Sequence, residues 1–270
     1  MRRADTWLML VVGALAVFVG IQVAGAPRVA PSVAPPSPAE SASVAARPNV
    51  PKPSTNSGAA PSADAELTVT HDNTEAPARN LDEIHARIAA ATDTYMADML
   101  ADMDQTLVRW PDLRERGLRI WVQSMTTVPD WDLRYAQMAR DAFSEWTSAG
   151  IPTRFDFVLD SATSDVRIVW IDRFPPMDGL RVGSTRRAVD QNGWLARAEI
   201  VIAVHDSAGR AIPPAALAGI VRHEAGHALG LGHSANQHTL MYPIALEDEI
   251  TPLDRATLRL LYDLPPGRVR

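Results

Sequence analysis

The chain of 270 residues has no cysteine. It therefore cannot form disulfides, bind a metal through thiolates or carry out thiol redox chemistry. Positive charge is not in excess either, because 26 Lys and Arg residues stand against 32 Asp and Glu residues, for a formal net charge of −6. Without a basic patch, the chain is not expected to bind nucleic acid.

Charged residues are also missing from residues 7–26, an apolar run that is long enough to cross a bilayer. Arg2 and Arg3 precede this run and place its start on the cytoplasmic side. Its end, Ala24-Gly25-Ala26, resembles a signal-peptidase site, but Pro27 would follow the cut and is a poor fit there. We therefore expect residues 1–26 to be a retained, single-pass cell-membrane anchor, with the rest of the chain outside the cytoplasm. Secretion after cleavage of a signal sequence is the alternative.

Large apolar side chains are scarce in residues 27–79, which hold 10 of the 21 prolines together with abundant alanine and serine. Such a segment cannot bury enough apolar surface to offset the entropy that is lost on ordering. We expect it to be a disordered spacer that lets the following domain reach well beyond the membrane surface.

Residues 80–109 form the next segment, in which apolar residues recur at helical spacing. Asn80 is a suitable N-cap and Pro111 a stop signal, so the pattern predicts one amphipathic helix over residues 81–108. This helix either packs on the domain that follows or is a stalk or prosegment that shields a cleft. We expect the domain to occupy residues 110–270 and to fold without this helix.

The rest of the chain combines strand and helix signals. Apolar runs bounded by turn residues predict strands, and apolar residues at helical spacing predict helices. The expected strands are residues 118–123, 155–159, 166–171, 180–184 and 194–204. The expected helices are residues 132–148, a helix opened by Pro213 and Pro214, and a last helix capped by Thr251 with Pro252 and Asp254 in its first turn.

The most informative segment is HEAGHALGLGH, residues 223–233. His223 and His227 lie four positions apart, so both side chains project from one face of a helix, with Glu224 beside them. Gly230 can adopt the positive φ that ends a helix and turns the chain back, which brings in His233. Three imidazole ligands leave the fourth position of a tetrahedral zinc open for water, as in catalytic rather than structural sites.

This pattern resembles the metzincins and, within them, the matrixins, which are matrix-metalloproteinase-like zinc endopeptidases. Ser234 directly follows the third histidine, as it does in matrixins. Met241, in the segment that follows, looks like the methionine of the family's Met-turn beneath the zinc. Residues 251–262 are similar to the closing helix of the family. The likeness covers residues 110–264 in total.

The resemblance implies an α+β fold, with a twisted, mostly parallel five-stranded sheet, three main helices and a zinc cleft beside an edge strand. Val201–Val204, just before the helix that carries the first two histidines, would be that edge strand, to which a peptide substrate adds as an extra strand. The continuous apolar run of this segment fits a fully buried strand equally well.

The resemblance also implies a zinc metalloendopeptidase (EC 3.4.24 type) that hydrolyses peptide bonds of extracytoplasmic proteins. His223, His227 and His233 would hold one catalytic zinc ion. Glu224 would take a proton from the zinc-bound water and pass it to the leaving amine. The alternatives are a non-catalytic, membrane-tethered zinc-dependent binding module, which has no need of Glu224, and a hydrolase of non-protein amides.

Further roles follow from the same resemblance. Met241 would form a hydrophobic floor beneath the histidines, and Pro243 would form part of the pocket wall for the side chain just after the scissile bond. In activated matrixins an aspartate at the position of Asp254 pairs with the new N-terminus, but a helix-cap role is favoured here. Because the chain has no cysteine, latency through a prosegment cysteine is excluded.

Other metal sites are not expected. Matrixins typically carry a second, structural zinc, but only His205 and Asp206 lie in the corresponding stretch. Calcium could draw on scattered aspartates, but no EF-hand-like spacing supports a calcium site. The remaining histidines are expected to be solvated, and they are His71, His85, His205 and His238.

Overall fold

The computed structural model describes residues 78–244 and 247–270. The expected membrane anchor at residues 1–26 and nearly all of the expected spacer at residues 27–79 lie outside the described residues. Within the described part of the chain, each helix is too short or too polar to span a bilayer.

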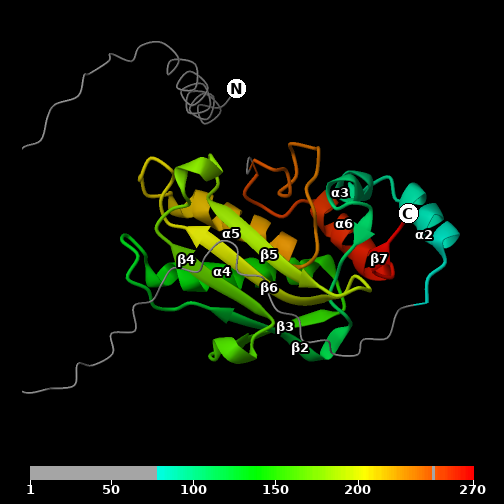
Figure 1. Cartoon of the computed structure of the whole chain (residues 1–270), viewed down its shortest axis with the longest axis horizontal. Coiled ribbons are helices and arrows are strands. Elements are labelled where there is room, and N and C mark those ends of the chain that lie inside the picture. Colours follow the sequence, from blue (N-terminus) through cyan, green and yellow to red (C-terminus); the bar gives the residue numbers. More distant parts are fainter. Residues whose placement is uncertain (1–77, 245–246) are drawn as a thin grey trace, which may run out of the picture. The chain divides into compact units, whose positions relative to one another are not determined.

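Five strands form one twisted sheet (Figure 1). Their bounds are β2 Leu113–Val122, β3 Thr153–Val158, β4 Val166–Ile171, β5 Gly183–Val189 and β6 Leu195–Ala203. The order across the sheet is β3-β2-β4-β6-β5, in which β5 alone pairs antiparallel with its neighbour. The expectation of an α+β fold with a mostly parallel five-stranded sheet is confirmed.

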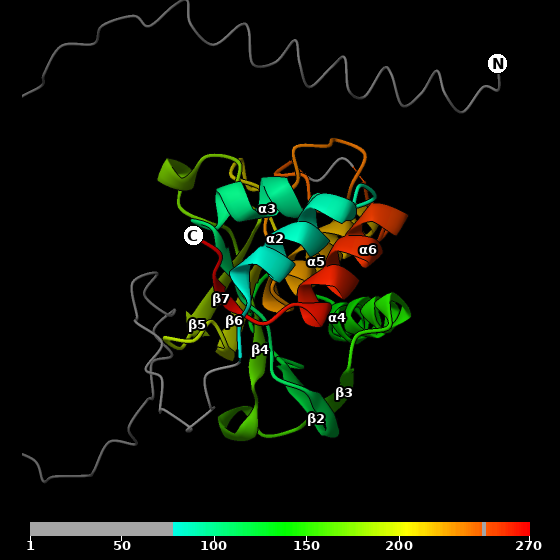
Figure 2. The ribbon, with the colours of Figure 1, turned by 90° about the vertical axis from the view of Figure 1, so that its right-hand side faces the viewer.

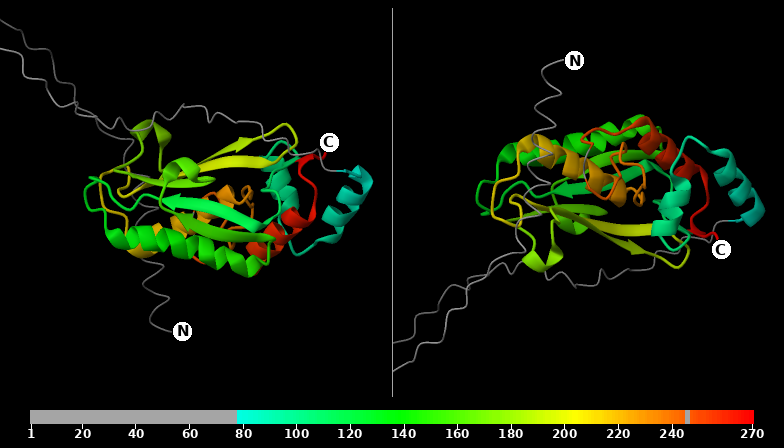
Figure 3. Two further views of the ribbon diagram at one scale, coloured as in Figure 1. Left: turned by 90° about the horizontal axis from the view of Figure 1, so that it is seen from below. Right: turned by 90° about the horizontal axis from the view of Figure 1, so that it is seen from above.

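Two long helices, α4 Leu133–Trp146 and α5 Pro214–Ala228, cover one face of this sheet (Figure 3). Side chains of a strand point alternately to its two faces, and in β2 the buried positions Leu118, Ile120 and Val122 follow this period of two. The same period is visible in the sequence. It therefore predicts which side chains of β2 enter the core, although the strand begins earlier than residue 118.

The structure corrects the expected position of the edge strand. β6 lies between β4 and β5, so the prediction that Val201–Val204 forms the edge is wrong, and the edge strand beside β6 is β5. Ile200 and Ile202 are fully buried and Val201 nearly so, which suits an interior strand with both faces covered. The order of strands in space differs from their order along the chain, because the chain passes from β4 to the edge and then returns to the middle.

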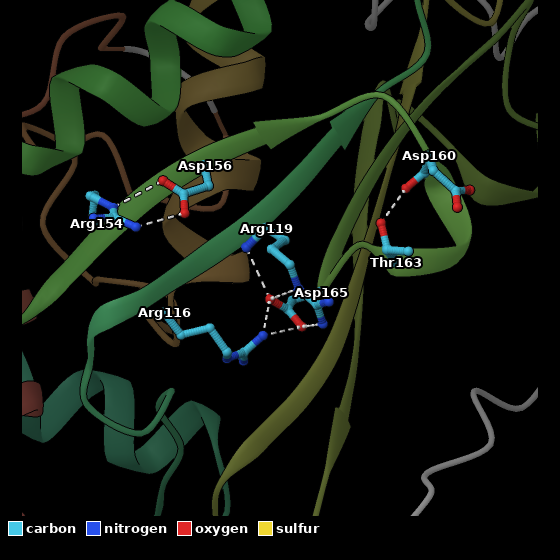
Figure 4. Close-up of polar contacts among 7 residues, drawn as sticks. All are labelled: Arg116, Arg119, Arg154, Asp156, Asp160, Thr163 and Asp165. Carbon is cyan, nitrogen blue, oxygen red and sulfur yellow. Dashed lines mark hydrogen bonds and ion pairs between the residues drawn. The ribbon is translucent and has the colours of Figure 1, made fainter.

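An ion-pair cluster ties β2 to the start of β4 (Figure 4). Asp165 is buried, and its carboxylate accepts hydrogen bonds from the guanidinium groups of Arg116 (3.0 Å) and Arg119 (2.8 Å) and from the Arg119 main-chain nitrogen (2.9 Å). Burial acts to raise the pKa of Asp165, but the hydrogen bonds from Arg119 and the charge of Arg116 outweigh it and keep the pKa below its ordinary value. The two ion pairs of Asp165 therefore support the parallel register of β2 and β4.

A third helix, α6 Pro252–Asp263, lies at one end of the sheet (Figure 1). It begins with a capping box, in which the Thr251 hydroxyl accepts from the Asp254 main-chain nitrogen and the Asp254 carboxylate accepts from the Thr251 main-chain nitrogen at 2.8 Å. The predicted cap of the last helix is confirmed.

The segment before the sheet forms two helices, α2 Leu81–Ala90 and α3 Met96–Asp102, which gather beside α6 (Figure 2). The prediction of one helix over residues 81–108 is wrong. A break at residues 91–95 separates the two helices, and residues 104–105 take positive φ after α3. Apolar spacing could not reveal the break, because both helices bury residues of the same kind on their inner faces.

These N-terminal helices share the core of the rest of the domain. Ile84 of α2 and Met96, Met99 and Leu100 of α3 are buried in the same apolar cluster as the sheet and α5. The next segment, β1 Thr106–Leu107, pairs antiparallel with β7 Gly267–Arg268, which follows α6. We therefore propose that the domain begins near residue 80 rather than at residue 110.

Candidate metal centre

The helix that carries the first two predicted ligands is α5. Pro214 stands in its first turn, where the missing N–H would have no helical partner in any case. The inner face is apolar, and Leu217, Val221 and Ala225 are fully buried. Packing against the sheet and α4 therefore fixes the orientation of α5 and of the histidines that it carries.

The three predicted ligands come together. The ligand nitrogens of His223, His227 and His233 lie within 4.8 Å of one another. Their ring centroids are 4.7 to 5.7 Å apart. In the part of the chain that the structure describes, no other group of three or more His, Cys, Asp or Glu side chains has a geometry that could hold a metal ion.

Each of these rings has its Nδ1 beside an acceptor. The His223 Nδ1 lies 2.7 Å from the Leu240 carbonyl oxygen, and the His227 Nδ1 lies 2.9 Å from the Leu231 carbonyl oxygen. The His233 Nδ1 lies 3.2 Å from a carboxylate oxygen of Asp102. Such oxygen atoms accept hydrogen bonds, so the proton is favoured on Nδ1 and Nε2 is left free to bind a metal.

The electrostatic environment also favours rings with an unprotonated Nε2. Burial lowers the pKa of His223 and lowers that of His227 much further, because the charged imidazolium is poorly solvated in the site. Both rings are therefore neutral at pH 7, as a metal ligand must be. Three imidazoles that converge on one point fit zinc.

A tight turn brings the third histidine to the first two. Gly230 has a φ of 113°, and its N–H donates to the His227 carbonyl at 3.0 Å. The N–H of Leu231 donates to the Gly226 carbonyl at 3.0 Å, which completes a Schellman motif. A Cβ at Gly230 would lie 2.3 Å from the Val108 carbonyl oxygen, so both the turn and the close approach require glycine.

Glu224, the predicted general base, is buried beneath the edge strand β5. Its Oε2 accepts a hydrogen bond of 2.6 Å from the Thr185 hydroxyl. Gly183 leaves room for the carboxylate, since a Cβ there would lie 2.5 Å from Oε1. Burial raises the pKa of Glu224 from an ordinary value of 4.5 to about 7, although Thr185 and the charges of Arg181 and Arg187 act in the opposite direction.

The predicted Met-turn residue Met241 is fully buried, and its sulfur would lie 2.5 Å from a Cβ placed on Gly226 of α5. Beneath it, the Asp254 carboxylate accepts from the main-chain nitrogens of Leu240 (3.0 Å) and Met241 (3.4 Å). The tyrosine hydroxyl of Tyr95 donates to the same carboxylate at 3.1 Å. Asp254 therefore caps α6 and also holds the turn that carries the acceptor of His223.

Pro243 is exposed in the loop after Met241. Its role as a pocket wall stays a prediction.

Two contacts of this site were not predicted from the sequence, one made by Thr185 and one made by the aspartates of α3. Thr185, which touches Glu224, lies in a strand whose pattern gave no sign of the contact. Asp98 and Asp102 of α3 accept hydrogen bonds from the main-chain nitrogens of Ala235 and His233, each at 3.1 Å. Two aspartates one helical turn apart are common on exposed helices, so the sequence offered no specific signal for either contact.

The other described histidines stay apart from this cluster. His205 is buried, with its ring nitrogens 2.9 Å from Asp130 and 2.7 Å from Asp172, so the expectation that it is solvated is wrong. The hydrogen bond to Asp130 and the charge of Asp172 raise its pKa. His85 lies 2.7 Å from the Val269 carbonyl oxygen and His238 is exposed.

An α+β fold with a mostly parallel sheet, and a histidine triad on a helix and the turn after it, are features of metzincin-like metallopeptidases. Residues 122–263, just over half of the chain, match the family model of the matrixins (peptidase family M10). The chain therefore belongs to the matrixin family.

A curated relative supports the same family. The chain is similar to metalloendoproteinase 1-MMP of Arabidopsis thaliana, with 36% identity over 111 residues. The matched stretch covers 38% of this chain and 30% of the relative, so the chain spans less than a third of the length of that protein. Helices α2 and α3 lie before the residues that match the family model.

Proposed function

We propose that this protein is a zinc-dependent endopeptidase of the EC 3.4.24 type that hydrolyses peptide bonds of proteins outside the cytoplasm. One observation carries the proposal most directly. Glu224 is a buried carboxylate that directly follows His223 on α5, and burial raises its pKa to about 7. The matrixin family match and the printed name of the relative, a metalloendoproteinase, support the same activity.

The metal would be held by the Nε2 atoms of His223, His227 and His233. When bound, zinc would supply Lewis-acid chemistry, because it lowers the pKa of a bound water to about 7 and polarises a carbonyl oxygen. The acceptors beside the three Nδ1 atoms orient the rings, and burial keeps His223 and His227 neutral, so the chain contributes a preformed set of ligands.

Glu224 would act as general base and then as general acid. It takes a proton from the attacking water while the water oxygen bonds to the peptide carbonyl carbon, and it then donates the proton to the nitrogen as the C–N bond breaks. A pKa near the working pH suits a group that must both accept and release a proton. Thr185 holds Oε2, which leaves the other oxygen of Glu224 for this transfer.

The substrate would bind along the edge strand β5. One side of β5 pairs with β6, and within the described residues its other side has no partner strand. Gly183 and Thr185 of β5 lie directly over Glu224, so a peptide added to this edge would run past the proposed base. An extended polypeptide fits this edge better than a compact non-protein amide does.

The location outside the cytoplasm, with residues 1–26 as a retained single-pass anchor, is also a proposal, supported by the uncharged run at residues 7–26. N-terminal sequencing of the protein from the membrane fraction tests it. A mature chain that starts at Pro27 or soon after would show that the segment is a cleaved signal sequence instead.

The central experiment compares full-length wild type, Glu224→Gln and His227→Ala with an unfolded protein as substrate. Wild type should bind one zinc ion and cleave the substrate. Glu224→Gln should keep the zinc and lose at least about a hundredfold in kcat, the scale of a positioned acid–base group. His227→Ala should lose both zinc and activity, because a ligand is missing.

The matched control is Glu145→Gln, which removes a carboxylate that pairs with Arg222 of α5 at 2.9 Å and is not one of the described partners of the three histidines. Its cleavage rate should stay near that of wild type. Zinc binding by the wild type without cleavage of any unfolded protein would favour the non-catalytic, zinc-dependent binding module. Near-normal turnover by Glu224→Gln would exclude Glu224 as the base.

A further inference from the structure

We infer that helix α3 is part of the metal centre, and that Asp102 is a positioning residue that orients His233 toward the metal. This inference rests on the proposed role of His233 as a zinc ligand. It concerns a segment that precedes the residues matching the matrixin family model, which begin at residue 122.

The contact between Asp102 and His233 uses one carboxylate oxygen. Asp102 Oδ2 accepts a hydrogen bond of 3.1 Å from the His233 main-chain nitrogen and lies 3.2 Å from the ring Nδ1. The same oxygen therefore restrains both the backbone and the ring of this residue. With Nδ1 beside a carboxylate, the proton is favoured on Nδ1, and Nε2 would be left free to bind the metal.

The other two ligands are restrained in a different way. His223 and His227 face main-chain carbonyls of Leu240, next to Met241, and of Leu231, in the turn that follows α5. His233 instead depends on a side chain that lies 131 positions earlier in the chain. A metal ligand of this kind, supported by a carboxylate, is held as firmly as the element that carries the carboxylate.

The position of α3 is well determined by packing. Met96 and Met99 are almost completely buried, and the main-chain nitrogen of Tyr95 donates to the Thr257 hydroxyl at 3.1 Å. Gly232, next to His233, allows the close approach, because a Cβ there would lie 2.9 Å from atoms of both Met99 and Met103. These buried contacts fix the position of α3, and therefore the position of Asp102 relative to His233.

Asp98 offers a matched control on the same helix. It lies one turn before Asp102, and its carboxylate accepts a hydrogen bond of the same length, 3.1 Å, from the main-chain nitrogen of Ala235. Asp98 thus supports the same loop but has no contact with a ligand ring among those described. A difference between the two variants isolates the effect on the imidazole of His233.

The test measures the zinc affinity of the full-length protein by competition with a chromogenic chelator, without substrate. Asp102→Ala should weaken zinc binding about 10- to 100-fold, the usual effect of removing such a partner. Asp102→Asn should weaken it less, because the amide oxygen still accepts a hydrogen bond. Asp98→Ala should stay close to wild type. Circular dichroism of the zinc-free proteins shows whether each variant is folded.

A second readout follows the tautomer of His233 by ¹⁵N NMR of the zinc-free protein. The wild type should keep its proton on Nδ1, and Asp102→Ala should populate the form with the proton on Nε2. Unchanged zinc affinity in Asp102→Ala, or an equal loss in Asp98→Ala, would overturn the inference. If Asp102→Ala does not fold, Asp102→Asn against Asp98→Asn gives the same comparison.

A failure of the proposed function and a failure of this inference give different results. If the wild type binds zinc but cleaves no peptide, the peptidase proposal is wrong, while the affinities of the Asp102 and Asp98 variants still decide the role of Asp102.

Discussion

The candidate metal centre has two halves that are built differently. The helix half consists of His223, His227 and Glu224 on α5, all largely buried, and its histidines are oriented by main-chain carbonyls. The loop half consists of His233 and its partner Asp102 on α3, whose side chains are 36% and 42% exposed. The first half is held by the backbone, and the second by a side chain from another segment.

This difference has a consequence for mutations. A main-chain carbonyl cannot be removed by substitution, so the helix half should tolerate changes in the residues that carry those carbonyls. The acceptor of the loop half can be removed by one substitution far from the HEAGHALGLGH segment. We therefore expect the loop half to be the weaker side of the metal centre.

The largest expected effect comes from removing the support of the loop half altogether. A chain that begins at Val108 lacks α2 and α3, and with them the buried Met96, Met99 and Leu100. Losing one such side chain typically destabilises a protein by about 2–5 kcal/mol, so losing several exceeds the stability of most domains. We expect this chain not to unfold cooperatively in a thermal melt followed by circular dichroism.

The control is a chain that begins at residue 78, which keeps both helices. It should melt like the full-length protein and bind zinc with the same affinity. Cooperative melting and normal zinc binding by the chain that begins at Val108 would restore the sequence-based expectation that the domain starts near residue 110.

A smaller effect is expected in the helix half, where Glu224 should make the stability of the protein depend on pH. In the zinc-free protein, burial raises the pKa of Glu224 from 4.5 to about 7. Folding then favours the protonated acid, so its contribution to stability is fully present below pH 4.5 and is lost as the pH rises through about 7. The loss is on the order of 3 kcal/mol for a shift of this size.

Urea unfolding of the zinc-free wild type and Glu224→Gln at pH 4.5 and pH 8 measures this effect. The glutamine variant cannot ionise, so it should lose less stability than the wild type between the two pH values. Because all histidines are common to both proteins, their titration cancels in the difference. The same pH dependence in both proteins would show that Glu224 is not buried as described.

The turn that joins the two halves offers a paired substitution. Gly230→Ala places a Cβ at a φ of 113° and 2.3 Å from the Val108 carbonyl oxygen, which is backbone and cannot move aside easily. We expect a loss of at least about 2 kcal/mol. Gly232→Ala meets only the flexible side chains of Met99 and Met103, and we expect a loss of about 1 kcal/mol.

Chemical denaturation of the zinc-loaded variants gives both values. The ranking matters more than either number, since it compares a backbone constraint with a side-chain contact. If Gly232→Ala proves the more damaging, α3 packs on the loop more tightly than the methionine contacts indicate.

An effect smaller than that of Gly230→Ala tests a second contact from the N-terminal segment, at the start of α3. Tyr95→Phe removes the hydrogen bond of 3.1 Å from the tyrosine hydroxyl to the buried Asp254 carboxylate. The expected loss is about 1.5 kcal/mol, at the lower end for a bond to a charged group, because Asp254 keeps its other donors. Thermal melts of the zinc-loaded protein measure it, and an unchanged Tm would mean that this bond does not support the Met-turn.

Much of the site could be predicted from the sequence. The four-residue spacing of His223 and His227 and the glycine at position 230 are local signals, and the structure brings the three predicted histidines together. The capping box of Thr251 and Asp254 is equally local and is confirmed. The edge strand and the helix over residues 81–108 were predicted wrongly, because each depends on which segments lie side by side in space.

Local rules of this kind act over a few residues, through helical periodicity, capping and turn geometry, and they are sufficient to predict that the three histidines come together. The class of fold and the role of the proposed base were predicted from the resemblance to the matrixins. Contacts between distant segments obey no such periodicity. Thr185 meets Glu224 across 39 positions, Asp102 meets His233 across 131, and Tyr95 meets Asp254 across 159. The sequence by itself therefore determined which residues could bind a metal. Only the tertiary structure decided what holds them in place, because that depends on how the whole core packs.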